Sequence, residues 1–557
     1  MSRSDRLGQY EQSSGTLLEQ QQWAGIAALI DLSESDELAP SGYATAAAAP
    51  EPATEFAPPA GRERRYARSS LLLPAVLVLQ AALSLRLIWS NTAYQDESLY
   101  LWAGRLELAH WTHGASVPAF QTYFSGSPAV YPPIAALADD IGGLAGARIL
   151  SLIFMLGATG LLYCTTYRLL DRRAAPAAAA FFATFGLGTE LGAFATYDAM
   201  ALFLTALAAY LVVRAGRAIS GEPLLVLAGL VLALAATTKY ATALWAPIVI
   251  CLAALTATRG PWRYRALRAG RLTCYMIVPL TLALITGGAE YVRGIAFTTL
   301  HRQIVTGTPP LRVLDIAWGW LALLLLLGIL GVVLIWHDSG RIEPIPLVLL
   351  AAALLAPIAQ ARIHDVTSLH KQVVFGAWFL CAVAGYAVSR IAFLDGKLSQ
   401  SVIISAVLLA VSTATGFSQA STIYASWPSV APAMPALARA IGTGPGTCPC
   451  LITQESAAEY YLPAADMAGP IVGPYTFTYR DAALPAGLSG PSAMAAAIMN
   501  GYFGAVEIDG LRTPGMYRLL RTSLRRSHQY TLTYQGTWPL KPGEPTQVWQ
   551  RIARAST

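Results

Sequence analysis

The sequence LLLPAVLVLQAALSLRLIWSNTAYQDESLYLWAGR, residues 71–105, joins an apolar run long enough to cross a bilayer to two adjacent carboxylates, Asp96 and Glu97. Charges beside the hydrocarbon core are costly unless they are solvated, paired or used. This stretch therefore predicts a membrane anchor and, directly after it, a candidate functional site.

The composition predicts many more membrane segments. Of 557 residues, 55% are hydrophobic and 13% are charged, whereas soluble domains carry roughly 25% charged residues. Spans are expected where charge-poor apolar segments reach about 17–25 residues. Eleven such segments lie near residues 69–90, 145–167, 174–189, 198–216, 222–237, 240–257, 271–287, 313–336, 344–360, 371–391 and 399–418. The fold class predicted is therefore an α-helical polytopic membrane protein.

The arginines and lysines predict the orientation of these spans, because both residues accumulate in short cytoplasmic loops. With residues 1–68 in the cytoplasm, the inner loops hold 17 Lys and Arg and the outer segments between spans hold 8. The first apolar run begins too late for a usual cleavable signal peptide. We therefore expect a multi-pass plasma-membrane protein with a cytoplasmic N-terminus and an extracytoplasmic C-terminus.

Three domains follow from the changes in composition. Residues 1–68 are rich in Ala, Pro, Glu, Gln and Ser and are predicted to be a disordered cytoplasmic segment. Residues 69–418 form the membrane domain. Residues 419–557 alternate strand-like and helical runs and predict a small extracytoplasmic α/β domain. The net charge of +6 is explained by loop arginines that face anionic lipid, and no nucleic-acid partner is expected.

Two of the six cysteines lie close together on the predicted outer side. Cys448 and Cys450 form a CPC pair where a disulfide is permitted, although so tight a ring would be strained. Two free thiols and a metal site are the alternatives. The other four cysteines lie in apolar spans and are expected to be buried small hydrophobic residues.

The predicted outer loops collect carboxylates early in the chain and cations later. Asp96 and Glu97 begin a segment with helical periodicity, where negative charge also suits the helix dipole, so a pair that only caps the helix is the alternative reading. Such an asymmetric face fits a site for a phosphate-bearing substrate at the outer leaflet. The outer groups are Asp96, Glu97, Glu190, Asp198, Lys239, Arg302, Arg362, His370 and Lys371.

The order of these features resembles the GT-C membrane glycosyltransferases, in particular the family 39-like branch that holds protein O-mannosyltransferases and the lipid A aminoarabinose transferase. The similar stretches are QDESLYLWAGR, YPPIAALADDIGGLAGARILSLIFMLGATGLLYCTTYRLL, FATYDAMALFLTALAAYLV and TKYATALWAPIVI, with a weaker match in SLHKQVVFGAWFLCAVAGYAVSR. The resemblance covers roughly residues 69–260 well.

This resemblance implies transfer of a sugar, with inversion, from a polyprenyl-phosphate-linked donor to a cell-envelope acceptor. Carried over, it makes Asp96 the general base and Asp198 a supporting acid, with Glu97 left for a metal or for orientation. A carboxylate within reach of the acceptor hydroxyl can take its proton.

The leaving lipid phosphate needs cations or a divalent metal close to the membrane interface. By position, the expected phosphate ligands are Lys239, His370 and Lys371, followed by Arg302 and Arg362. A divalent ion such as Mg²⁺ or Mn²⁺ is an optional cofactor. Its tentative ligands are Glu97 and Asp198, since hard cations prefer oxygen.

The rival interpretation is a membrane transporter or a lipid or polysaccharide flippase. Transporters place ionisable groups near the bilayer midplane and often carry internal repeats. The apolar spans here hold few charges and show no repeat. The sequence therefore favours the glycosyltransferase.

The arginine distribution generates a test of topology. A tag fused after Thr557 is expected to be accessible from outside intact cells, and a tag before Met1 is expected to be accessible only after permeabilisation. Protease protection of the C-terminal tag in intact cells would contradict the assignment, because it would place Asp96 in the cytoplasm.

Overall fold

The computed structural model describes residues 72–552 except 219–220, 258–260, 301–306, 393–397, 443–447, 463–470, 475–476, 482–483 and 512–513. All described residues belong to one compact unit, Glu63–Thr557. The predicted N-terminal segment 1–68 and the predicted phosphate ligand Arg302 lie outside the described residues.

Every predicted span coincides with a helix, which confirms the helical polytopic fold class. Seven helices are long and apolar enough to cross a membrane: α6 (Tyr131–Leu169), α9 (Tyr197–Ala215), α12 (Trp262–Ile295), α13 (Pro310–Ser339), α14 (Pro344–Arg362), α15 (Leu369–Ile391) and α16 (Leu398–Tyr424). The other four predicted spans correspond to shorter apolar helices: α4 (Leu72–Ile88), α7 (Ala174–Thr184), α10 (Glu222–Thr238) and α11 (Ala246–Leu255).

Helix α6 consists of two helical parts that meet at a kink at Gly142 and Gly143, where Gly143 has a φ of 62°. The predicted second span, residues 145–167, coincides with the part after the kink. The charged Asp139 and Asp140 lie just before the kink and interrupt the apolar pattern. Glycine suits this kink, because a positive φ is strained for residues with a side chain.

The predicted surface helix after the first span is α5 (Gln95–His113), which carries Asp96 and Glu97 in its first turn. It begins where the Tyr94 N–H donates to Glu97 Oε2 at 2.9 Å and ends at Gly114, whose φ is 68°. The short helices η1 (Phe120–Thr122), α8 (Gly186–Leu191), η2 (Tyr240–Trp245) and η3 (Ala296–Leu300) connect the longer ones.

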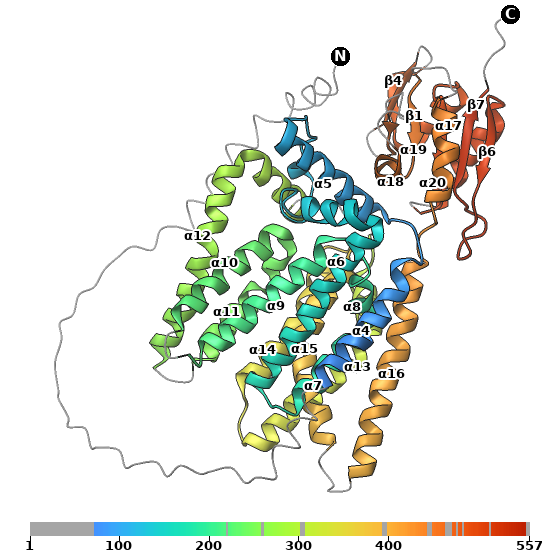
Figure 1. Ribbon diagram of the computed structural model, residues 1–557. Coiled ribbons are helices and arrows are strands. Elements are labelled where there is room, and N and C mark those ends of the chain that lie inside the picture. Colours follow the sequence, from blue (N-terminus) through green and yellow to red (C-terminus); the bar gives the residue numbers. More distant parts are fainter. Residues whose placement is uncertain are drawn as a thin grey trace, which may run out of the picture. The chain divides into compact units, whose positions relative to one another are not determined.

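Helix α15 lies at the centre of the bundle. Nearly all of its side chains are buried, and it packs against α7, α13 and α14 (Figure 1). Two tryptophan indole N–H groups donate hydrogen bonds to backbone carbonyls of a neighbouring helix. Trp378 donates to Ala158 of α6 at 2.9 Å, and Trp245 donates to Ala352 of α14 at 3.1 Å. Helix α15 is therefore fixed by its packing against three helices and by the Trp378 hydrogen bond.

The C-terminal part is an α/β region, as predicted. Its five-stranded sheet has the order β2-β1-β5-β7-β6, with β1, β2 and β5 parallel and the other two pairings antiparallel. The strands are β1 (Cys450–Ile452), β2 (Ile471–Val472), β5 (Ala505–Ile508), β6 (Tyr530–Gln535) and β7 (Gln547–Arg551), beside a hairpin of β3 (Thr478–Asp481) and β4 (Leu484–Ser489). The helices are η4 (Ala431–Ala433), α17 (Met434–Gly442), α18 (Glu455–Tyr461), α19 (Gly490–Met499) and α20 (Pro514–Ser527).

Two details concern the boundary and the cysteines of this region. Helix α16 extends to Tyr424, beyond the predicted end of the membrane domain at residue 418, and the domain boundary itself stays a prediction. Cys448 and Cys450 are both free thiols. Of the alternatives left open by the sequence, the structure therefore has two thiols rather than a disulfide.

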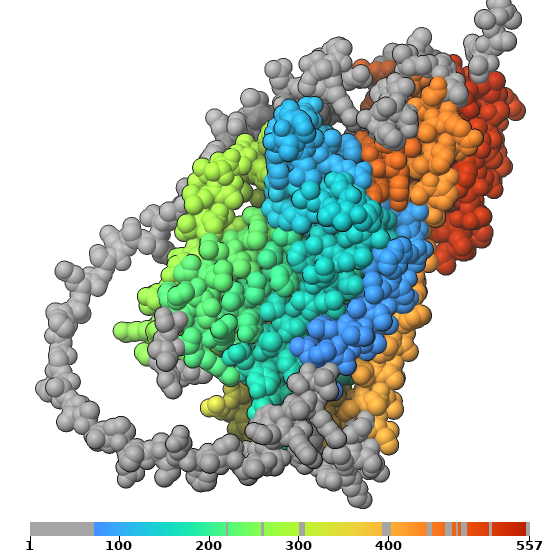
Figure 2. All heavy atoms as spheres, viewed as in Figure 1, coloured from blue at the N-terminus to red at the C-terminus, as the bar shows by residue number. Residues whose placement is uncertain are grey.

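Helix α18 joins this α/β region to the first helices of the membrane part. The Tyr460 hydroxyl donates to Asp139 of α6 at 2.7 Å, and the Tyr461 hydroxyl accepts from the Ala93 N–H at 2.8 Å. Figure 2 shows the first helices and the C-terminal region packed against each other without a gap on this face. The segment that leads into α5 is thus held from the C-terminal region as well as from the bundle.

The packing of α5 on α6 generates a prediction. A methyl group at Gly104 would overlap the backbone carbonyl of Pro132, and overpacking of this kind costs about 1–3 kcal/mol. Gly104→Ala should therefore lower the midpoint of thermal unfolding in detergent. Gly319→Ala in α13 is the matched control, because a methyl group there meets nothing within 4 Å. Equal midpoints for the two variants would contradict this packing.

Candidate functional site

Two carboxylate–lysine pairs form the centre of the candidate site. Asp96 of α5 accepts a 2.6 Å hydrogen bond from the Lys371 ammonium of α15. Asp198, in the first turn of α9, pairs with Lys239, which follows the last turn of α10. The structure thus brings together four predicted site residues that are far apart in the sequence.

The two pairs differ in accessibility. The Asp96 side chain is 34% exposed and its partner Lys371 only 4%. Both members of the Asp198–Lys239 pair are buried. Asp96 is therefore the carboxylate of the centre that an incoming molecule can reach.

Aromatic rings surround both lysines. The Lys371 ammonium lies 4.8 Å from the centre of the Phe194 ring, and the Lys239 ammonium lies 5.5 Å from Tyr197 and 5.8 Å from Phe375. Such rings attract cations and exclude water, which strengthens electrostatic interactions among the charges they enclose.

A strained turn sets the start of α15. His364 and Ser368 have positive φ values of 55° and 64°, which residues with side chains rarely adopt. Asp365 Oδ1 stabilises the turn by accepting from the N–H and the hydroxyl of Thr367 at 3.0 and 2.8 Å. Strain of this kind persists where the surrounding structure fixes it, often at functional sites. The turn places His370 and Lys371 in the first helical turn.

Glu97 has a different environment from the one predicted. It is fully buried and forms two 2.8 Å hydrogen bonds with Arg148. Its oxygens also accept from the N–H groups of Ala195 and Tyr94, at 2.8 and 2.9 Å. All four acceptor positions of the carboxylate are therefore occupied. This geometry favours the orienting role that the sequence analysis allowed beside the metal, and both roles stay predictions.

Arg148 is the residue that the sequence analysis missed. Besides Glu97 it donates to the backbone carbonyls of Ile88, Asn91 and Thr92, at 2.6, 2.9 and 3.1 Å. It thereby fixes the whole segment that precedes Asp96. A lone arginine within the apolar run GLAGARILSLIF was a signal that could have found it.

The predicted metal site has no ligand set among the residues that the structure describes. No three His, Cys, Asp or Glu side chains are grouped there as a metal site would require. Of the two tentative ligands, Glu97 is bonded to Arg148 and Asp198 to Lys239. A dependence on Mg²⁺ or Mn²⁺ stays a prediction.

His370 lies beside the centre and faces a carboxylate of its own. Its Nε2 is 3.7 Å from Glu190 Oε1, and burial raises the pKa of Glu190 to about 8. Arg362, in contrast, ends α14 with an exposed side chain. No described contact joins Arg362 to either carboxylate–lysine pair.

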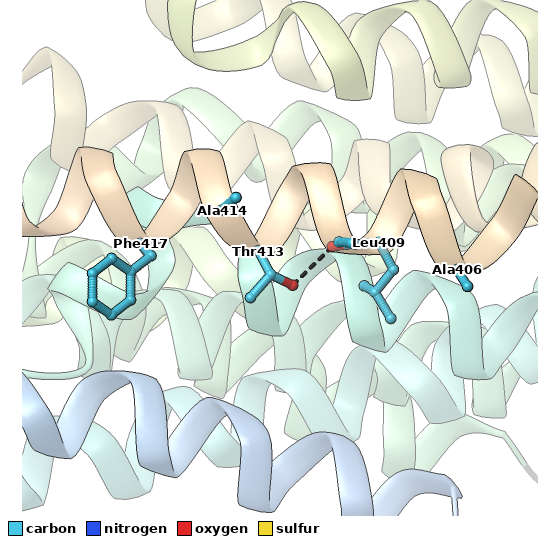
Figure 3. Close-up of a pocket in the computed structure, with 6 residues that line it drawn as sticks. Ala406, Leu409, Thr413, Ala414 and Phe417 are labelled. Atoms are coloured by element: carbon cyan, nitrogen blue, oxygen red, sulfur yellow. Dashed lines mark hydrogen bonds between the residues drawn. The ribbon is translucent and has the colours of Figure 1, made fainter.

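A shallow apolar groove runs along α16, away from these charges. It is lined by Ala406, Leu409, Ala410, Thr413, Ala414 and Phe417 (Figure 3). The Thr413 hydroxyl donates to the Leu409 carbonyl of its own helix at 2.7 Å, so the one hydroxyl among the lining residues is already bonded. The groove is a lipid-compatible surface and contributes nothing to the charged centre.

Comparisons with known proteins identify the fold. Residues 128–284 match the family described as dolichyl-phosphate-mannose-protein mannosyltransferase. No curated protein matches the chain.

Several solved structures match along most of the chain. ArnT from Cupriavidus metallidurans bound to undecaprenyl phosphate is 15% identical, with a TM-score of 0.56 over 87% of this chain and 98% of that one. Its apo state gives a TM-score of 0.53. The oligosaccharyltransferase AglB from Archaeoglobus fulgidus, with an inhibitory peptide and a dolichol-phosphate, is 12% identical, with a TM-score of 0.51 over 87% and 74%. The chain therefore has the GT-C fold.

The Glu97–Arg148 pair generates a prediction about stability. Removing one partner of a buried ion pair costs about 3–5 kcal/mol, because the other charge is left uncompensated. Arg148→Met should therefore lower the free energy of unfolding, measured by denaturant titration in detergent, far more than Arg312→Met. Arg312 forms an exposed pair with Asp315, and such pairs contribute about 1 kcal/mol or less. Similar losses in both variants would contradict the structural role of Arg148.

Proposed function

We propose that this chain, which has the GT-C fold of membrane glycosyltransferases, moves a sugar from a polyprenyl-phosphate-linked donor to an extracytoplasmic acceptor of the cell envelope. One observation carries the proposal: the Asp96 carboxylate, about a third exposed, is held by the buried Lys371 ammonium at 2.6 Å. The reaction is a single displacement with inversion, and Asp96 is the general base.

The similar structures support a lipid-phosphate donor. ArnT binds undecaprenyl phosphate and AglB binds a dolichol-phosphate, and the description of the matching family also names a dolichyl-phosphate sugar. The identities of 12–15% leave the sugar and the acceptor open.

The proposed step begins with the acceptor hydroxyl at Asp96. The Asp96 carboxylate takes the hydroxyl proton while the acceptor oxygen bonds to the anomeric carbon of the donor sugar. The bond from that carbon to the phosphate oxygen breaks, and its electron pair goes to the lipid phosphate. Lys371 holds Asp96 with its second oxygen free to receive the proton.

The lysines have a second role, because the leaving phosphate gains negative charge. In the described structure each lysine is neutralised by one aspartate. A bound donor phosphate would share Lys371 and Lys239 with these aspartates, which favours the transition state in which the charge develops. His370 is the next ligand by position, and Arg302 and Arg362 are the outer candidates. Any divalent ion would add to this charge stabilisation.

The expected location of the centre is the outer face of the plasma membrane. The cytoplasmic N-terminus and extracytoplasmic C-terminus, inferred from the loop arginines, put α5 and the C-terminal α/β region on that side. Acceptors of the cell envelope then reach Asp96 from water, and the donor stays anchored in the membrane.

The test uses purified protein and a membrane lipid extract that contains lipid-linked sugars. Wild-type protein should release free polyprenyl phosphate, measured by mass spectrometry. Asp96→Asn keeps the size of the side chain but removes the base, so it should lower the rate by roughly 10²–10⁴-fold.

The matched control is Asp140→Asn, which changes an exposed carboxylate near Arg105 and should leave the rate unchanged. Wild-type release by Asp96→Asn would refute the assignment of the base. Absence of release by the wild-type protein from any lipid-linked sugar would refute the donor class.

A further inference from the structure

Glu190 is a buried carboxylate that the proposed transfer does not use. It lies in α8 with no exposed surface. Within the described residues neither of its oxygens has a hydrogen-bond partner. An unpartnered buried carboxylate is unfavourable by several kcal/mol when ionised. Its presence beside the charged centre therefore requires an explanation.

Among the described residues, the His370 imidazole is the one group that can form an ion pair with Glu190, and it does so only when it is protonated. Glu190 also faces Lys371, Asp198, Glu97 and the Tyr424 phenol. Glu97 is neutralised by Arg148, and each lysine is neutralised by an aspartate. The positive and negative charges of the centre are thus equal in number without Glu190. An ionised Glu190 would therefore give the centre an excess negative charge.

His370 is the group that can change this balance. Its Nε2 lies 3.7 Å from Glu190 Oε1, and its side chain is 26% exposed whereas Glu190 is enclosed. Burial, together with the ammonium groups of Lys371 and Lys239, lowers the pKa of His370 in spite of the Asp198 and Asp96 carboxylates, so the imidazole is neutral while no anion is bound. A shift of about 1 Å would bring the two groups to hydrogen-bond distance. The imidazole therefore connects the enclosed carboxylate with the accessible side of the centre.

We propose that Glu190 is a proton store for His370: binding of an anionic phosphate moves the Glu190 proton to His370 and turns a neutral pair into a carboxylate–imidazolium ion pair. The carboxyl O–H bond breaks and leaves its electrons on the Glu190 oxygen. The new N–H bond forms from the Nε2 lone pair. The pair carries no net charge before or after, and no co-reactant is needed. His370 Nδ1–H then donates to the phosphate.

The inference rests on the proposed function for the identity of the ligand, a lipid phosphate. In the transfer, the charge that develops on the leaving phosphate would meet an imidazolium supplied from within the protein. His370 is then a phosphate ligand, and Glu190 is a positioning residue that acts through it.

The pH dependence has a definite sign. Since burial raises the pKa of Glu190 to about 8, the pair holds its proton below about pH 8 and loses it above. Without the proton, His370 is neutral and Glu190 is negative, so an anion binds weakly. Affinity for a phosphate should be constant between pH 7 and pH 8 and should then fall by up to tenfold per pH unit.

The experiment measures the Kd of farnesyl phosphate for the purified full chain in detergent, between pH 7 and pH 9.5. Phosphate monoesters have their second pKa near 6, so the probe itself does not titrate in this range. Wild-type protein should show the break near pH 8. Glu190→Gln cannot give up a proton, so it should bind about tenfold more weakly at pH 7, the effect of losing a charge-assisted hydrogen bond, and should show no break. Glu190→Asp should restore the break.

A double-mutant cycle separates a proton store from a simple charge effect. If Glu190 acts through His370, Glu190→Gln should have little further effect on affinity at pH 7 in a His370→Gln background. Additive effects would overturn the inference, as would a break that persists in Glu190→Gln or a wild-type protein that binds farnesyl phosphate equally at all pH values or not at all. Thermal unfolding of each variant checks that it is folded.

The outcome is independent of the transfer assay. A break that depends on Glu190 in a protein without sugar transfer would support the proton store and refute the enzyme. Transfer that requires Asp96, with a Kd that does not depend on pH, would support the enzyme and refute the store.

Discussion

The buried Arg148–Glu97 pair is the interaction on which the rest of the site depends. One guanidinium binds Glu97 twice and three backbone carbonyls between residues 88 and 92. Glu97 in turn holds the first turn of α5 and the Ala195 N–H of the segment before α9. An ion pair without exposed surface is expensive to desolvate, and its contribution is to fix one geometry. The segment between the first helix and Asp96, the proposed base, is thus held by several hydrogen bonds from one buried side chain.

Charge balance explains how so many ionisable groups coexist at this place. Each lysine of the centre has an aspartate, and Arg148 has Glu97. A phosphate that enters such a balanced centre must share the lysines with their aspartates, and it is held more tightly when a further positive charge appears or an aspartate is protonated. In the proposed reaction, general base catalysis would protonate Asp96, and this would free Lys371 for the phosphate at the moment when the charge of the phosphate grows. Proton transfer and phosphate stabilisation are therefore coupled through a single ammonium group.

The sequence predicted the helices well, because apolar length and arginine-rich loops are local properties. It also named Asp96, Asp198, Lys239 and Lys371, since charges next to apolar spans are conspicuous. It could not predict their pairing, which depends on how helices far apart in the chain pack together. The pairing of Glu97 with Arg148 could not be predicted for the same reason: a carboxylate next to a candidate base resembles a metal ligand until its partner 51 residues later is seen. The sequence indicated Glu190 as a carboxylate of an outer loop. It could not predict the burial of Glu190, because burial depends on how distant helices pack together.

The C-terminal region extends this argument beyond the bundle. Tyr461 accepts from the Ala93 N–H, and Trp427 donates to the Thr92 carbonyl at 3.1 Å. Arg148 reaches the same short segment from the membrane side. Backbone groups at an interface have few chances to find water, so each of these bonds satisfies a group that would otherwise be left unpaired. The α/β region therefore completes the hydrogen bonding of the segment that carries Asp96, and loss of that region would affect the base before it affected the bundle.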